Sequence, residues 1–156
     1  MNLLIENFVS QDLKQLTKNI RVNCLVGQVS VLPIALSNIT GLQDLSFGSD
    51  TEGGALNAFG VNFGDDGSQF SVLSSATWLG FTGDFLLKSC VISRVPALIK
   101  IDVDGIEHFI LEGLVGILNS SDCKSVFIEA NAEFTEQYES IAEMLSSHGF
   151  VKHSEI

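Results

Sequence analysis

Short apolar runs alternate with helical patterns along the second half of the chain. Residues 98–101 and 126–129 form two largely apolar runs of strand length. Residues 106–118 and 134–145 place apolar side chains on one helical face, and Gly149 is suited to end the second helix. Strand, helix, strand and helix at this spacing are typical of a βαβ unit. We therefore expect the two strands to be parallel neighbours in an α/β fold.

The first part of the chain carries a similar pattern. Residues 3–5 are apolar and lead into Glu6, which we expect at the end of a strand. Ser10 stands where a helix N-cap would be, and Leu and Ile residues follow at helical spacing up to residue 20. Residues 29–36 predict a further strand.

The segment between these two parts has no strong periodicity. Residues 38–77 are rich in Gly, Ser, Asp and Asn, with single Leu and Phe residues between them. A structureless loop of that length is uncommon in a compact domain. We therefore expect one partial domain over residues 1–156, in which residues 38–77 are an irregular or hairpin insertion that covers the site.

Composition and charge narrow the class of protein. The chain has 156 residues, which suits one domain, and 46% of them are hydrophobic, enough for a sizeable core. Its formal net charge of −11, with no basic run, argues against nucleic acid or an anionic membrane surface as a partner. Cys24, Cys90 and Cys123 are scattered, which indicates neither a zinc site nor a disulfide framework and fits a reducing compartment. With no signal-peptide pattern at Met1 and no long apolar run, we expect a cytoplasmic protein.

Three expected strands end in a carboxylate: Glu6, Asp102 and Glu129. In open parallel sheets, ligands bind beyond the carboxyl ends of the strands. Asp102 follows its strand directly and has no local partner in the sequence, so we expect it to face the ligand crevice. Asp102 and Glu129 are the candidate catalytic residues, in that order.

The residues after Asp102 favour a structural interpretation. Asp104 is a good N-cap, and Glu107 follows at the spacing of a capping box. His108 and His148 are expected on helix surfaces. No G-x-S-x-G turn surrounds any serine, so a hydrolase triad has no support.

Three blocks of the sequence resemble the FkbM family of methyltransferases. The most specific is IKIDVDGIE at residues 99–107, followed by LEG at 111–113, which is similar to the family's IKIDVEG-x-E block, with Asp104 in place of the more usual Glu. VLPIALS at residues 31–37 resembles the P-x-A-L-S segment. Residues 5–23 are similar to the family's acidic strand end and its L-x-x-N-I-x-x-N helix. The resemblance covers nearly all of the chain.

This resemblance implies a Rossmann-like class I methyltransferase fold with S-adenosylmethionine as methyl donor. It implies O-methylation of a hydroxyl on a sugar or a small natural product. Matched to the family pattern, Glu6 would bind the ribose hydroxyls of the cofactor. Ala35, Leu36 and Ser37 would lie near the adenine, and Asp102 near the methionine end and the acceptor. No metal is implied.

The family also has a strand and a glycine-rich turn ahead of the position of Glu6, where this chain has five residues. We therefore expect an incomplete sheet that lacks the first strand and the glycine-rich turn, and no methyl transfer by this chain alone. One alternative is a catalytically inactive fragment that serves as a folded or interaction module. The other is a haloacid-dehalogenase-type phosphatase, whose D-x-D-G strand end is similar, but here Ile106 stands where that class has Thr, and only Lys124 and Lys152 follow.

Overall fold

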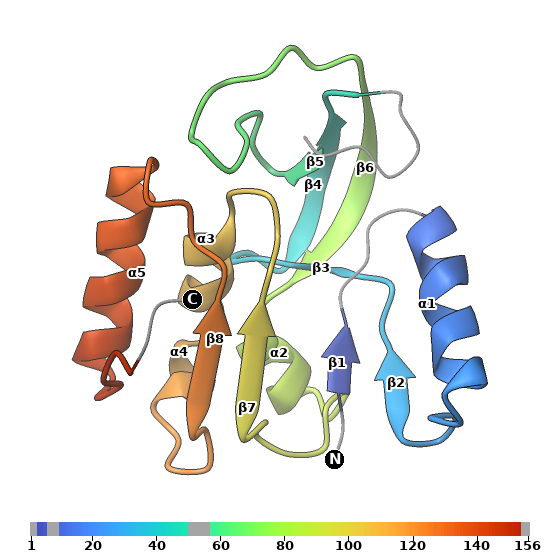
Figure 1. Ribbon diagram of the computed structural model, residues 1–156, viewed down its shortest axis with the longest axis vertical. Helices are drawn as coiled ribbons and strands as arrows, with labels where there is room; N and C mark the ends of the chain where they lie inside the picture. Colours follow the sequence, from blue (N-terminus) through green and yellow to red (C-terminus); the bar gives the residue numbers. More distant parts are fainter. Residues whose placement is uncertain (1–2, 6–9, 50–56, 154–156) are drawn as a thin grey trace.

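The structure, a computed structural model, describes residues 3–5, 10–49 and 57–153. It is a mixed α/β fold in which the C-terminal half forms a βαβ unit (Figure 1). β7 (Leu98–Ile101) and β8 (Ser125–Ile128) pair in parallel, with Leu98 opposite Ser125 and Ile101 opposite Ile128. The expected parallel pairing of these two strands is therefore confirmed. α5 (Thr135–Ser147) follows β8, and Gly149 ends it in the left-handed region at φ +83°.

The crossover between β7 and β8 is two short helices and not the single helix that the apolar pattern predicts. α3 (Glu107–Glu112) ends at Gly113, and α4 (Val115–Leu118) begins two residues later. The Asp84 carboxylate, from α2 (Gly83–Lys88), accepts the backbone N–H groups of Gly116 and Ile117 at 2.7 and 2.9 Å. A side chain from elsewhere in the chain thus caps the start of a new helix.

The N-terminal pair of strands is also parallel. β1 (Leu3–Ile5) pairs with β2 (Val29–Val31), and α1 (Ser10–Val22) connects them. The single strand expected over residues 29–36 is wrong. β2 stops pairing with β1 after Val31, and the chain then forms a separate strand, β3 (Ala35–Leu36), which pairs with a strand of another sheet. Pro33 lies at this break, where its missing N–H could not extend the ladder.

The segment expected to be an insertion contributes to an antiparallel sheet. β4 (Gly41–Phe47) pairs with β6 (Ser74–Phe81) over its whole length, and β5 (Asn57–Phe59) pairs with the far end of β4. The sheet has the order β3-β6-β4-β5, with β3 parallel to β6. In Figure 1 it stands above the carboxyl ends of β7 and β8.

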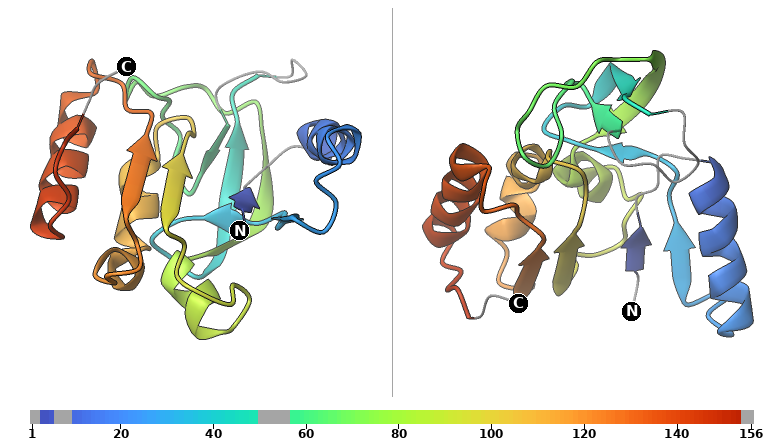
Figure 2. Two further views of the ribbon diagram at one scale, coloured as in Figure 1. Left: turned by 60° about the horizontal axis from the view of Figure 1, so that its bottom comes forward. Right: turned by 45° about the horizontal axis from the view of Figure 1, so that its top comes forward.

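The hydrophobic core lies between the β7–β8 pair, the helices α2 to α4 and the antiparallel sheet (Figure 2). Ile101 from β7, Ile110 and Leu111 from α3, and Leu45 and Phe59 from the antiparallel sheet are all at most 4% exposed.

In Figure 1 the four parallel strands point the same way, and β1 stands between its partner β2 and β7. Within the described residues, the β1–β2 and β7–β8 ladders are nevertheless separate sheets. None of the described helices is both long enough and apolar enough to cross a membrane.

Candidate functional site

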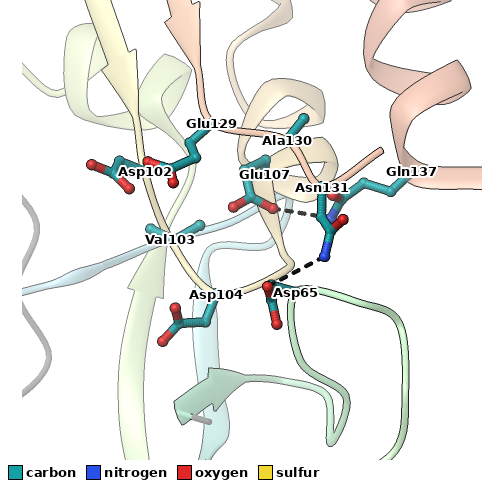
Figure 3. Close-up of a pocket in the computed structure, with 9 residues that line it drawn as sticks. All are labelled: Asp65, Asp102, Val103, Asp104, Glu107, Glu129, Ala130, Asn131 and Gln137. Atoms are coloured by element: carbon teal, nitrogen blue, oxygen red, sulfur yellow. Dashed lines mark hydrogen bonds between the residues drawn. The ribbon is translucent and has the colours of Figure 1, made fainter. Parts of the chain in front are cut away.

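A hollow of about 250 Å³ lies at the carboxyl ends of β7 and β8 (Figure 3). It is bordered by the turn after β7, the loop after β8, the start of α5 and the loop that follows β5. Five of the lining side chains are carboxylates, and none of the lining residues is Lys or Arg. The lining residues are Asp65, Asp102, Val103, Asp104, Glu107, Glu129, Ala130, Asn131 and Gln137.

Asp102 and Glu129 lie side by side at one edge of this hollow because each directly follows one of two paired parallel strands (Figure 3). The backbone N–H of Glu129 donates to the carbonyl of Ile101 at 3.0 Å, which continues the ladder up to the two carboxylates. Both side chains are accessible to solvent. The structure thus brings the two predicted catalytic residues together.

The two carboxyl groups share a hydrogen bond, and its effect on their pKa values is opposite. The pKa of Asp102 is lowered, first by its hydrogen bond with Lys100 and then by the one with Glu129. The pKa of Glu129 is raised, chiefly by its hydrogen bond with Asp102 and by the Asp102 charge. Lys100, which also forms an ion pair with Asp102, fixes this asymmetry. The two groups therefore titrate as a pair, in which the proton is favoured on Glu129 and the negative charge on Asp102.

The capping box expected at Asp104 and Glu107 is wrong in its first member. α3 begins at Glu107, its N-cap is Ile106, and no side chain caps it. Asp104 instead borders the hollow, where burial and then the charges of Asp65 and Asp102 raise its pKa.

Glu107 does have a structural position, as its spacing indicated. Its side chain is 2% exposed, and its carboxylate accepts a hydrogen bond from the backbone N–H of Gly105 at 3.4 Å. Burial nevertheless raises the pKa of Glu107. Gly105 closes this turn at φ +100°, and a Cβ there would lie 2.4 Å from the carbonyl oxygen of Gly64. Only glycine allows both features.

Gln137, which the sequence did not single out, completes the base of the hollow. It is 2% exposed, and its Nε2 donates to the carbonyl of Gly105 at 2.5 Å and to Oε2 of Glu107 at 3.0 Å. Nδ1 of His108 lies 3.2 Å from the same nitrogen. His108 is half-buried and not on the surface, and burial lowers its pKa. The sequence feature that could have identified Gln137 is its place as a polar residue on the inward face of α5, one turn before Ile141.

The loop after β5 reaches the hollow from the antiparallel sheet. Asp65 borders the hollow, and its carboxylate accepts a hydrogen bond from Nδ2 of Asn131 at 3.4 Å. The rings of Phe63 and Phe134 meet edge to face at 5.8 Å. A Cβ at Gly67 would lie 2.9 Å from the Phe134 ring. Residues from the middle of the sequence therefore pack directly against the loop that follows β8.

Of the residues expected near the ribose and the adenine of the cofactor, those that the structure describes do not line the acidic hollow. Glu6 is outside the described residues. Ala35 is fully buried in the core, so only its backbone is available to a ligand, and Leu36 is half-buried. Ser37 borders a second hollow of about 150 Å³, which shares no lining residue with the first. Of the expected cofactor residues that the structure describes, only Asp102 lies at the acidic hollow.

Comparison of the chain with protein-family models, with curated proteins and with solved structures finds no significant match. Within the described part of the chain, no group of three His, Cys, Asp or Glu side chains has an arrangement that could hold a metal ion.

Proposed function

We propose that the chain is an S-adenosylmethionine-dependent methyltransferase domain of the FkbM type that methylates a hydroxyl on a sugar or a small natural product. The observation that carries the proposal is the Asp102–Glu129 pair, which lies where two parallel strands open into an acidic hollow. Asp102 belongs to the sequence block with the most specific resemblance to that family. Ligands of parallel α/β sheets bind at this edge.

The acidic hollow suits the methionine end of the cofactor, whose sulfonium and ammonium groups are cations. Asp102 would lie nearest to these groups because its pKa is lowered and it keeps its negative charge. Glu6 would bind the ribose hydroxyls, and the backbone of Ala35 with Leu36 and Ser37 would lie near the adenine. In this proposal the β1–β2 and β7–β8 ladders are the two flanks of a Rossmann-like sheet, whose first strand would lie between β1 and β7.

The methyl donor supplies a carbon that is already activated by the sulfonium. The protein's own contribution is to hold the acceptor oxygen in line with that carbon and to remove its proton. Of the two carboxyl groups, Glu129 is the stronger base because its pKa is raised, and Asp102 is the better partner for a cation. These pKa directions reverse the order expected from sequence, in which Asp102 was the first candidate for the base.

The test compares S-adenosylmethionine with S-adenosylhomocysteine, which lacks the positive charge on sulfur. Each is titrated into the 15N-labelled 156-residue chain up to millimolar concentration, and amide shifts are followed by NMR. We expect shifts at residues 102–105 and 129–131, with weaker than micromolar binding and higher affinity for the sulfonium form. Asp102→Asn should reduce the difference between the two ligands. Absence of shifts at these residues with either ligand would contradict the proposal.

A second candidate is a folded module without catalysis. The observation that favours it is the separation of the β1–β2 and β7–β8 ladders within the described residues. The same titration decides between the candidates. A module that does not bind the cofactor should show no site-specific preference for S-adenosylmethionine, a sulfonium, over S-adenosylhomocysteine, a thioether.

A further inference from the structure

We infer that Gln137 is the positioning residue for the Asp102–Glu129 pair. Its side-chain amide joins α5 to the turn that carries Asp102. The inference deepens the proposed function and rests on it only for the reaction that the pair serves. The positioning itself can be measured in the absence of any cofactor.

Two hydrogen bonds of Gln137 go to the turn after β7, and its amide nitrogen also lies 3.2 Å from Nδ1 of His108 on α3. Its Nε2 donates to the Gly105 carbonyl at 2.5 Å and to Glu107 Oε2 at 3.0 Å, across 32 and 30 residues of sequence. An amide nitrogen carries two hydrogens, so these two bonds use both. The Gln137 side chain is 2% exposed, so water does not replace the bonds if they are lost.

These contacts reach the pair through Glu107. The Glu107 carboxylate accepts the backbone N–H of Gly105 at 3.4 Å, so it holds the turn that follows Asp102. Gln137 donates a hydrogen bond to that carboxylate and another to the Gly105 carbonyl, so it holds the turn at two points. The direction in which Asp102 leaves β7 is therefore set by a side chain on α5.

An apolar residue of similar size would fill the same volume and support the packing of α5, but it would offer no donor. Glu107 would then be buried with one donor fewer, and burial already favours its protonated form. A neutral carboxyl holds backbone amides less strongly, so the turn would relax and Asp102 would no longer be held against Glu129.

The experiment is a 13C NMR titration of the side-chain carboxyl groups in the 156-residue chain without ligand. Gln137→Leu is compared with wild type, with Asp102→Asn and with Ile141→Val. Ile141 is the matched control because it is buried on the same helix, one turn away, and makes no polar contact through its side chain. Besides the two partners, Lys100 and Asp104 bear on the titration of Glu129, and Glu107 and His108 lie against Gln137; none of these four is changed.

In Gln137→Leu, the Glu129 midpoint should move at least half of the way from its wild-type value to its Asp102→Asn value. In Ile141→Val it should stay at the wild-type value. A wild-type Glu129 midpoint in a folded Gln137→Leu protein would overturn the inference.

A second measurement needs no variant. The side-chain amide resonances of Gln137 in the wild-type chain should show a pH-dependent shift at the midpoint of the pair, besides the shifts that its own contacts Glu107 and His108 cause. If they do not, the inference fails even where Gln137→Leu does not fold. Neither readout depends on S-adenosylmethionine, so failure here leaves the cofactor titration unaffected, and failure of that titration leaves the positioning role intact.

Discussion

Asp102 and Glu129 share one hydrogen bond across the ends of two paired parallel strands. The bond requires one of the two groups to carry a proton. Lys100 decides which, because it lies against Asp102 and stabilises the charge there. The negative charge of the pair is therefore favoured on Asp102, and the proton, when the pair binds one, is favoured on Glu129.

The first prediction concerns the proton on Glu129. Its pKa is raised above the ordinary 4.5, so its contribution to stability is present below pH 4.5 and is lost as pH rises through the folded-state pKa. Glu129→Gln keeps a permanent donor to Asp102 and removes this loss. Urea unfolding of both proteins over this pH range should show wild type losing stability relative to the variant as pH rises. Parallel pH curves would contradict the shared proton.

The second prediction separates chemistry from structure. Glu107→Ala removes a buried acceptor of the Gly105 backbone N–H and of the Gln137 amide, and should cost about 1–3 kcal/mol of unfolding free energy. Asp102→Asn changes an exposed side chain and should stay within about 0.5 kcal/mol of wild type. In a methyl-transfer assay of a form that turns over, Asp102→Asn should lower kcat by more than Asp122→Asn, a change at an exposed site in a turn. Full turnover in Asp102→Asn would remove it from the reaction.

The third prediction concerns the close contact of Gly105 with Gly64. Gly105→Ala meets both a left-handed backbone at φ +100° and a Cβ 2.4 Å from the Gly64 carbonyl oxygen. Gly27→Ala meets only the backbone cost, since φ there is +84° and nothing lies within 4 Å of the added Cβ. The Gly27 variant should lose about 1–2 kcal/mol, and the Gly105 variant clearly more. Equal losses in chemical denaturation would show that the loop after β5 does not pack on the turn.

The fourth prediction concerns His108. Burial lowers its pKa below 6.5, so the unfolded chain binds a proton more readily than the folded one. The contribution of His108 to stability is therefore present above pH 6.5 and is lost as pH falls through its folded-state pKa. His108→Asn should reduce the slope of unfolding free energy against pH just below 6.5. Glu112→Gln should extend the loss to lower pH, because the Glu112 charge raises the pKa of His108.

The parallel neighbours β7 and β8, and with them the Asp102–Glu129 pair, could be predicted because they depend on local pattern and on one rule. Apolar runs separated by an amphipathic crossover form parallel neighbours, and residues that follow such strands meet at one edge. The break at Pro33 was also visible in principle, since proline cannot extend an inner ladder.

Contacts between distant segments could not be predicted in the same way. Asp84 starts α4 across 32 residues, and Asp65 reaches Asn131 across 66. Gln137 is a polar residue in an apolar stripe, and its partners, Gly105 and Glu107, belong to another element. Such bonds depend on which elements pack together, and a single sequence shows only that an element exists.

The separate β1–β2 ladder has a consequence for how the protein opens. Of the described side chains from residue 13 to 31, none is buried and none belongs to the hydrophobic core. α1 has 13 residues, a length at which an isolated helix is marginal in water. The β1–α1–β2 segment should therefore behave as a separate cooperative unit that detaches while the core of α3 and β7 stays folded. In native-state hydrogen exchange, the amides of α1 should lose protection at lower urea than those of Ile110 and Leu111, so that this chain has two unfolding free energies and not one.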